Sequence, residues 1–128
     1  MHVTRSASGY DDTVRSLLEG IEGRGLTVFG RIDHAAGARE AGLELAPEEV
    51  VLFGNPKSGT PLMQRDPRIG VELPLRMLVW EDADGVAVGY NDPLDLAASY
   101  DVEPSRSTLE AMSSLLATVA NRAAGCPQ

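Results

Sequence analysis

The chain has 128 residues, a length that suits one domain able to bury roughly two-thirds of the surface that its unfolded form exposes. Its formal net charge is −8, so long-range attraction to nucleic acid or to an anionic membrane is disfavoured. No apolar run approaches the ~20 residues of a membrane span, and the start "MHVTRSASGYDD" lacks signal-peptide features. The sequence therefore predicts one cytoplasmic domain over residues 1–128.

The chain has too few cysteine and histidine residues for a disulfide bond or for a metal site built from them. Cys126 is the single cysteine and cannot form an internal disulfide. A metal site needs three or four ligands, and no cluster of histidine, cysteine or carboxylate residues has ligand spacing. We therefore expect neither a metal nor a cofactor.

The N-terminal region predicts a weak strand over residues 2–6 and then an amphipathic helix. Apolar residues with the i, i+3, i+4 and i+7 spacing of one helix face are Val14, Leu17, Leu18 and Ile21. Asp11 or Asp12 is the expected N-cap, and Gly23 ends the helix.

From Leu26 the hydrophobic period changes to two, which indicates a strand. The face expected to point inward carries Leu26, Val28, Gly30, Ile32 and His34. The opposite face carries Thr27, Phe29, Arg31 and Asp33. A short alanine-rich helix over residues 35–41 should end at Gly42, and residues 50–53 form a continuous apolar strand core.

The second half predicts a hairpin and a closing helix. Alternating apolar residues indicate a strand over 75–80, and "EDADG" at 81–85 is a hairpin turn in which Gly85 takes a left-handed conformation. A return strand over 86–90 is broken by "NDP", which a short helix follows. The last amphipathic helix is expected at about 105–124, with a stripe of Leu109, Met112, Leu116, Val119, Ala120 and Ala123.

This order of elements predicts an α+β fold. Strands and helices do not alternate throughout, so a doubly wound parallel sheet is excluded. We expect an antiparallel sheet of about five strands, two main helices packed on one face and short helices in the loops.

Five short motifs carry a resemblance to a known family: "DH" at 33–34, "FGNP" at 53–56, "GTPLM" at 59–63, "LP" at 73–74 and "YNDP" at 90–93. Over about residues 10–100 the sequence closely resembles domain-of-unknown-function family 302 of bacteria and archaea. The resemblance implies a TATA-binding-protein-like fold, with helices on one antiparallel sheet, and a homodimer. It implies no activity.

The stretch "VLFGNPKSGTPLMQRDP", residues 51–67, is the strongest family signature and the first candidate site. It does not match the P-loop pattern G-x-x-x-x-G-K-[ST], because Pro56 and not a glycine precedes Lys57. Thr60 is the expected N-cap of a helix with Pro61 at its first position, and Lys57 and Gly59 border the same opening. A small anion can bind such a helix start, but the alternative is that Thr60 satisfies the free N–H groups and that Asn55 closes a turn.

His34 and Tyr90 complete the candidates. His34 is expected to be partly buried at a strand end, as a general base or ligand, or else as a residue that caps the next helix. Tyr90 is expected to carry its hydroxyl toward a cavity between sheet and helices, whereas the rest of "YNDP" reads as a turn.

Three hypotheses follow. The first is a non-enzymatic domain that binds or senses a small molecule or anion, with His34, Asn55, Lys57, Gly59, Thr60 and Tyr90 near its mouth. The second is a structural homodimer whose outward apolar residues, such as Phe29, Leu78 and Trp80, meet a second copy. The third is an enzyme that uses His34 as acid or base.

Overall fold

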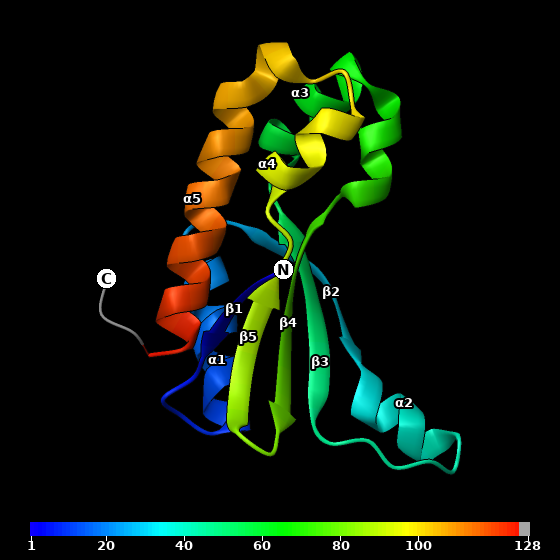
Figure 1. Cartoon of the computed structure of the whole chain (residues 1–128), viewed down its shortest axis with the longest axis vertical. Coiled ribbons are helices and arrows are strands. Elements are labelled where there is room, and N and C mark those ends of the chain that lie inside the picture. The colour runs from blue at the N-terminus through cyan, green and yellow to red at the C-terminus, as the bar shows by residue number, and fades with distance from the viewer. Residues whose placement is uncertain (126–128) are drawn as a thin grey trace.

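A five-stranded antiparallel sheet forms the centre of the molecule in the computed structural model, which describes residues 1–125 (Figure 1). The strand order is β1-β5-β4-β3-β2, and every neighbouring pair is antiparallel. The strands are β1 (His2–Arg5), β2 (Thr27–Asp33), β3 (Glu48–Gly54), β4 (Leu75–Asp82) and β5 (Gly85–Tyr90). The predicted α+β fold with an antiparallel sheet is confirmed.

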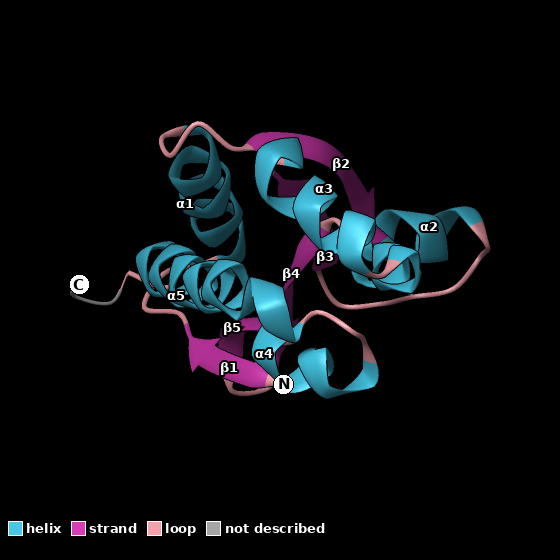
Figure 2. Ribbon diagram, turned by 90° about the horizontal axis from the view of Figure 1, so that it is seen from above, coloured by secondary structure: helices cyan, strands magenta, loops and turns pink. Residues whose placement is uncertain are grey.

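Two long helices cover one face of this sheet. The helices α1 (Tyr10–Glu22) and α5 (Arg106–Ala123) pack against each other, and Figure 2 shows both on the same side of the strands. Their apolar stripes are buried against the inward side chains of the three central strands, which include Val51, Phe53, Met77, Val79 and Val88. The helix spacing seen in the sequence therefore identified the two helices that form the core.

The remaining helices are short. One group lies at a single end of the sheet in Figure 1 and is called here the helical cap, residues 56–72 and 93–105. It contains α3 (Pro56–Arg65), α4 (Pro93–Leu96) and the 3-10 helices η1 (Pro67–Glu72), η2 (Ala97–Ser99) and η3 (Glu103–Ser105). The helix α2 (His34–Glu40) lies apart from this group, on the side of the sheet away from α1 and α5 (Figure 2).

A bulge in β2 reverses the faces that the sequence predicted for this strand. Val28 pairs with Phe53, but the next pair is Gly30 with Leu52, so Phe29 has no partner in β3. An unpaired residue shifts each later side chain to the opposite face. Ile32 is consequently 48% exposed on the outer face rather than buried. The prediction that Ile32 and His34 share the inward face of Val28 is wrong.

The first helix also begins earlier than predicted. Gly9 is its N-cap, and Asp11 and Asp12 lie within the first turn instead of capping it. The helix therefore starts two or three residues before the predicted position, and Tyr10, its first residue, is partly buried against the core. The two carboxylates lie near the positive end of the helix dipole. The predicted C-terminal end is confirmed, because Gly23 is the C-cap.

The hairpin and the last helix are present as predicted, but β4 extends to Asp82, so the turn comprises only residues 83–84 and not 81–85. Gly85 has φ +110° at the hairpin turn, and Ser105 is the N-cap of α5. Cys126 lies outside the described residues. Within residues 1–125, no helix has both the length and the apolar character needed to cross a bilayer.

Candidate functional site

An apolar cleft of about 430 Å³ opens where the helical cap meets the sheet. Its walls come from the start of β2, the end of β3, the segment from α3 to residue 75, and the middle of α5. The lining residues are Leu26, Phe29, Leu52, Gly54, Asn55, Pro56, Ser58, Gly59, Thr60, Met63, Gly70, Leu73, Pro74, Leu75, Met112 and Leu115. None of them is charged, and the polar side chains all belong to residues 55–60.

The polar wall of the cleft is the first part of α3, which begins five residues before the predicted start. Asn55 is the N-cap: its Oδ1 accepts a hydrogen bond of 2.9 Å from the backbone N–H of Lys57. Pro56 occupies the first helical position, where its missing N–H is not needed. Thr60 and Pro61 lie inside the helix, so the predicted N-cap at Thr60 is wrong.

Glycines bring α3 close to the segment that follows it. A Cβ built on Gly59 would lie 3.6 Å from Leu73 Cδ1, and one built on Gly70 would lie 3.3 Å from Met63 Sδ. A larger side chain at Gly70 would therefore push against Met63. These two positions keep α3 packed against residues 70–73 along one wall of the cleft.

Three of the predicted site residues line this cleft. They are Asn55, Gly59 and Thr60, all in the family signature at 51–67. Lys57 belongs to the same helix but does not line the cleft, and its side chain is exposed. The sequence thus located the correct wall, although it placed the helix start wrongly.

His34 lies outside the cleft. It is the first residue of α2, its side chain is exposed, and within residues 1–125 it makes no side-chain hydrogen bond or ion pair. Asp33, not His34, caps the helix, because its Oδ1 accepts a hydrogen bond of 2.8 Å from the Ala36 N–H. The predicted partial burial of His34 and its alternative role as a cap are both wrong.

Tyr90 is buried but points elsewhere. Its ring stacks on the imidazole of His2, with 5.2 Å between ring centroids and 11° between the planes. Burial raises the pKa of the Tyr90 hydroxyl, and the negative charge of Asp92 adds to that rise. Tyr90 lines neither this cleft nor the other cavities between the sheet and the helices, so the expectation that its hydroxyl reaches such a cavity is wrong.

Asp92 of the "YNDP" motif fixes the cap to α5. Its Oδ1 accepts a hydrogen bond of 2.9 Å from the Leu94 N–H, and its Oδ2 accepts one of 2.7 Å from Ser113 Oγ. The side chain therefore starts α4 and ties that helix to α5. This agrees with the structural reading of the motif.

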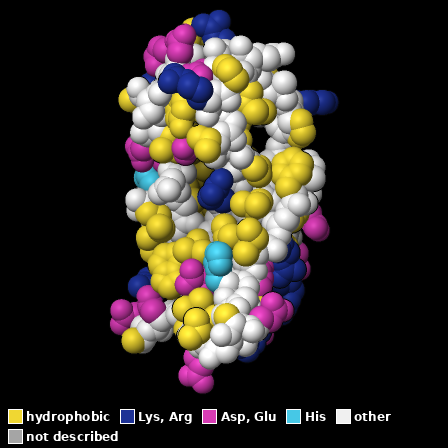
Figure 3. All heavy atoms as spheres, turned by 90° about the vertical axis from the view of Figure 1, so that its right-hand side faces the viewer, with side chains coloured by type: hydrophobic (Ala, Val, Ile, Leu, Met, Phe, Trp, Pro, Cys, Tyr) yellow, Lys and Arg dark blue, Asp and Glu magenta, His cyan; other side chains and the backbone are white. Residues whose placement is uncertain are grey.

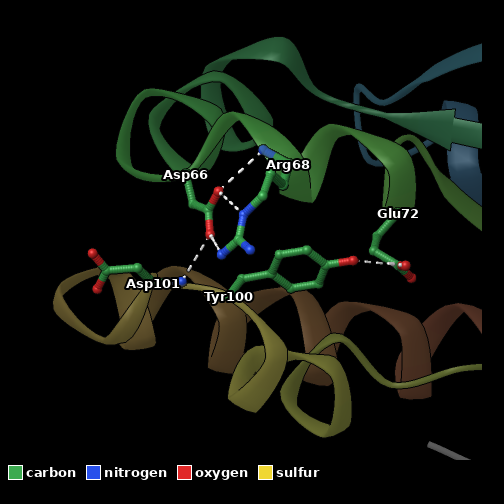
Figure 4. Close-up of polar contacts among 5 residues, drawn as sticks. All are labelled: Asp66, Arg68, Glu72, Tyr100 and Asp101. Carbon is green, nitrogen blue, oxygen red and sulfur yellow. Dashed lines mark hydrogen bonds and ion pairs between the residues drawn. The ribbon is translucent and has the colours of Figure 1, made fainter.

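A second carboxylate joins the two halves of the helical cap (Figure 4). Asp66, 5% exposed, accepts hydrogen bonds from the backbone N–H and the guanidinium of Arg68, and from the N–H of Asp101 at 3.0 Å. The guanidinium, and then the Asp101 N–H, hold the pKa of the Asp66 carboxyl well below its usual range. The Asp66 carboxylate thus links residues 66–68 to residue 101.

Tyr100 supplies the second link in Figure 4. Its hydroxyl donates a hydrogen bond of 3.0 Å to Glu72 Oε1, and the Arg68 guanidinium lies 5.9 Å from the centre of its ring. Burial raises the pKa of Tyr100, and its hydrogen bond to the Glu72 carboxylate adds to that rise. Together the Asp66 and Tyr100 contacts hold η1 against the segment after α4, and η1 contributes Gly70 to the cleft wall.

The apolar walls were not predicted from the sequence. Leu26, Phe29, Met112 and Leu115 come from elements far apart in the chain, and no local pattern places them together. The apolar lining residues that had a signal belong to the 51–67 stretch, such as Met63, or to the "LP" motif at 73–74. An uncharged cleft of this kind is suited to binding, because it presents no acid, base or nucleophile with a positioned partner. Among residues 1–125, no group of three potential ligands could hold a metal ion.

The chain matches part of longer curated proteins. It is 43% identical over 116 residues to the fluoride-specific ion channel FluC 1 of Brucella suis biovar 1 (strain 1330), covering 89% of this chain and 46% of that protein. The fluoride-specific ion channel FluC 1 of Brucella abortus biovar 1 (strain 9-941) is 43% identical over 116 residues, with 89% of this chain and 43% of that protein covered. The chain thus spans about half the length of the curated relatives it matches.

A solved structure shares the fold. It is the crystal structure of an uncharacterized conserved protein DUF302 from Bacillus stearothermophilus, with a TM-score of 0.84 and 18% identity, covering 95% of this chain and 96% of that one. The sequence model of "Domain of unknown function DUF302" matches residues 1–119. This chain therefore belongs to the DUF302 family.

Proposed function

We propose that this chain is a binding domain that holds a small, largely apolar molecule in the cleft beneath α3. The observation that carries the proposal is the cleft itself, which has a volume of about 430 Å³ and an uncharged lining. Small-molecule sites typically have about 300–1,000 Å³, apolar walls and a few polar groups that orient the ligand. Asn55, Ser58 and Thr60 are the candidates for that orienting role.

The experiment is a fluorescence titration with the neutral apolar probe N-phenyl-naphthylamine. We compare the natural protein with Met63→Trp, which places a large ring at the cleft wall, and with Gln64→Trp as the matched control. Both positions are exposed residues of α3, but only Met63 lines the cleft. We expect Met63→Trp to weaken probe binding about tenfold, which corresponds to ~1.4 kcal/mol, and Gln64→Trp to leave it unchanged.

Two outcomes contradict the proposal. One is the absence of saturable probe binding to the natural protein. The other is equal binding to the natural protein and to both variants, which would place the probe outside the cleft. Native mass spectrometry of the purified protein adds a direct readout, because a co-purified molecule would appear as a mass above that of the chain.

A small anion is the alternative ligand, and the names of the curated relatives make fluoride the anion to test. The start of α3 is its expected location, but the Asn55 side chain already accepts the Lys57 N–H there. We therefore expect sodium fluoride to give the same melting temperature as sodium chloride at equal ionic strength. A specific rise with fluoride would favour the anion over the apolar ligand.

Homodimerisation through the open face of the sheet is a second candidate function. Apolar side chains lie on this face beside Arg76: Val3 and Ile32 are 50% and 48% exposed, and Val50, Leu78 and Trp80 are half-buried. Figure 3 shows hydrophobic side chains spread over the side of the molecule that includes this face. Large contiguous apolar patches are rare on monomers, and a second copy offers the same patch in return.

The dimer predicts twice the chain mass of 13.6 kDa in light scattering at micromolar concentration. Leu78→Lys places a charge in the middle of the open face and should give the monomer mass. Glu110→Lys, on the exposed side of α5, is the control and should leave the dimer intact. A monomer of the natural protein under these conditions would rule this candidate out.

A further inference from the structure

We infer that the molecule bound in the cleft carries a carboxylate and that Arg76 binds it at the rim. This inference rests on the proposed function, because it assigns a chemical class to the ligand of the same cleft. Arg76 is the second residue of β4, and Leu52 of β3 lies directly opposite it. Side chains at opposite positions have Cβ atoms about 4.5–5.5 Å apart on the same face. Since Leu52 lines the cleft, the base of the Arg76 side chain lies next to the cleft wall.

Arg76 is free to bind an anion. Its side chain is exposed, and within residues 1–125 it makes no ion pair and no hydrogen bond. Its partner across β3 is Leu52, and the next residue of β3 on the same face is Val50, so the Arg76 side chain leaves the strand beside apolar side chains. A guanidinium in such surroundings favours a planar, bidentate partner such as a carboxylate.

A second, smaller cavity lies on the other side of Arg76. Its volume is about 180 Å³, and its lining includes Glu72, Arg76 and Asn91. Asn91 is a second polar residue of the same lining. Glu72 already accepts the Tyr100 hydroxyl, which directs part of its carboxylate away from a bound anion. This cavity therefore provides charged side chains, which the larger cleft lacks.

The two cavities adjoin each other. Leu73, Leu75 and Met112 line both, so the apolar cleft and the cavity at Arg76 share part of their walls. A molecule with an apolar chain and one carboxylate matches this arrangement. Its chain would lie against Leu52 and the cleft walls, and its carboxylate would accept two N–H bonds from Arg76. A medium-chain monocarboxylate is the ligand class that results.

The test measures displacement of N-phenyl-naphthylamine by decanoate, by decanol and by decyltrimethylammonium, which share an apolar chain and differ in head-group charge. For the natural protein we expect decanoate to displace the probe at about tenfold lower concentration than decanol, and the cation to be the weakest. Arg76→Gln should remove the preference for decanoate and leave decanol unchanged. Arg76→Lys, which keeps the positive charge, should retain part of the preference for decanoate.

Arg39→Gln is the matched control, because Arg39 is also exposed and lies on α2, away from the cleft. It should behave like the natural protein. Equal displacement by decanoate and decanol, or a preference that survives in Arg76→Gln, would overturn the carboxylate assignment while leaving the apolar binding function intact. Failure of the neutral probe and of decanol to bind at all would overturn both.

Discussion

Asn55 and Thr60 each precede a proline, and only one of them can begin α3. Both are good N-cap residues, and both prolines suit the first helical position. Starting at Asn55 lets Leu62 reach the core, where it is fully buried, and sets Met63 on the cleft wall. The choice thus depends on what the helix packs against, and the local sequence does not contain that information.

The two caps predict different stabilities after substitution. We expect Asn55→Ala to lower the free energy of unfolding by about 1 kcal/mol, because the Lys57 N–H loses its partner. Thr60→Ala should leave this free energy unchanged or raise it slightly, since Thr60 is an exposed residue of a helix interior and alanine is the better helix former. Urea denaturation measures both. A larger loss in Thr60→Ala than in Asn55→Ala would restore the start at Thr60.

At the level of elements, the helical periodicity of α1 and α5 predicted the buried faces correctly, whereas the alternation in β2 did not. The stripes of α1 and α5 are set by side chains three and four residues apart, so they are visible in the sequence alone. The alternation in β2 looked equally regular, yet the bulge at Phe29 reverses it. A bulge depends on how β2 pairs with β3, and the sequence of β2 by itself does not encode that pairing.

The contacts between the two halves of the helical cap give a prediction about pH. The folded state holds the pKa of Asp66 below its unfolded value of about 3.9, so the charge of Asp66 stabilises the protein above that value. This contribution is fully present above about pH 5 and is lost as the pH falls through 3.9 toward the lower folded pKa. Asp66→Asn should therefore be less stable than the natural protein at neutral pH, and the difference should shrink in acid.

Urea denaturation at a series of pH values measures this difference. Asp101→Asn is the control, because Asp101 contributes only its backbone N–H to Asp66 and its side chain is exposed. It should show no comparable dependence on pH. If the difference in the free energy of unfolding between Asp66→Asn and the natural protein stayed constant from neutral pH down to acid, the charge of the Asp66 carboxylate would not be the source of the stabilisation.

For the whole molecule, the fold was more predictable than the site. The fold follows from element order and from two helix stripes, whereas the cleft is made by segments near residues 26–29, 52–63, 70–75 and 112–115. These segments meet only after the cap has folded over the end of the sheet. The sequence indicated the 51–67 wall because its glycines and prolines are unusual, but the facing residues are ordinary apolar positions of β2 and α5.

A cleft assembled from distant segments exists only in the folded state, so its ligand should stabilise the whole protein by mass action. A probe present at 100 times its dissociation constant stabilises the folded state by about 2.7 kcal/mol, which corresponds to a rise of roughly 5–10 °C in the melting temperature at this chain length. The fluorescence of Trp80, the only tryptophan, reports the transition. We expect N-phenyl-naphthylamine to raise the melting temperature of the natural protein and of Gln64→Trp, and to raise that of Met63→Trp much less. For the two variants, whose added tryptophan obscures the signal of Trp80, the melting temperature is measured by calorimetry. An equal rise for all three proteins would place the probe on the open sheet face, and in that case Leu78→Lys should abolish the rise. If the probe binds in the cleft, the Leu78→Lys protein should show the same rise in melting temperature as the natural protein.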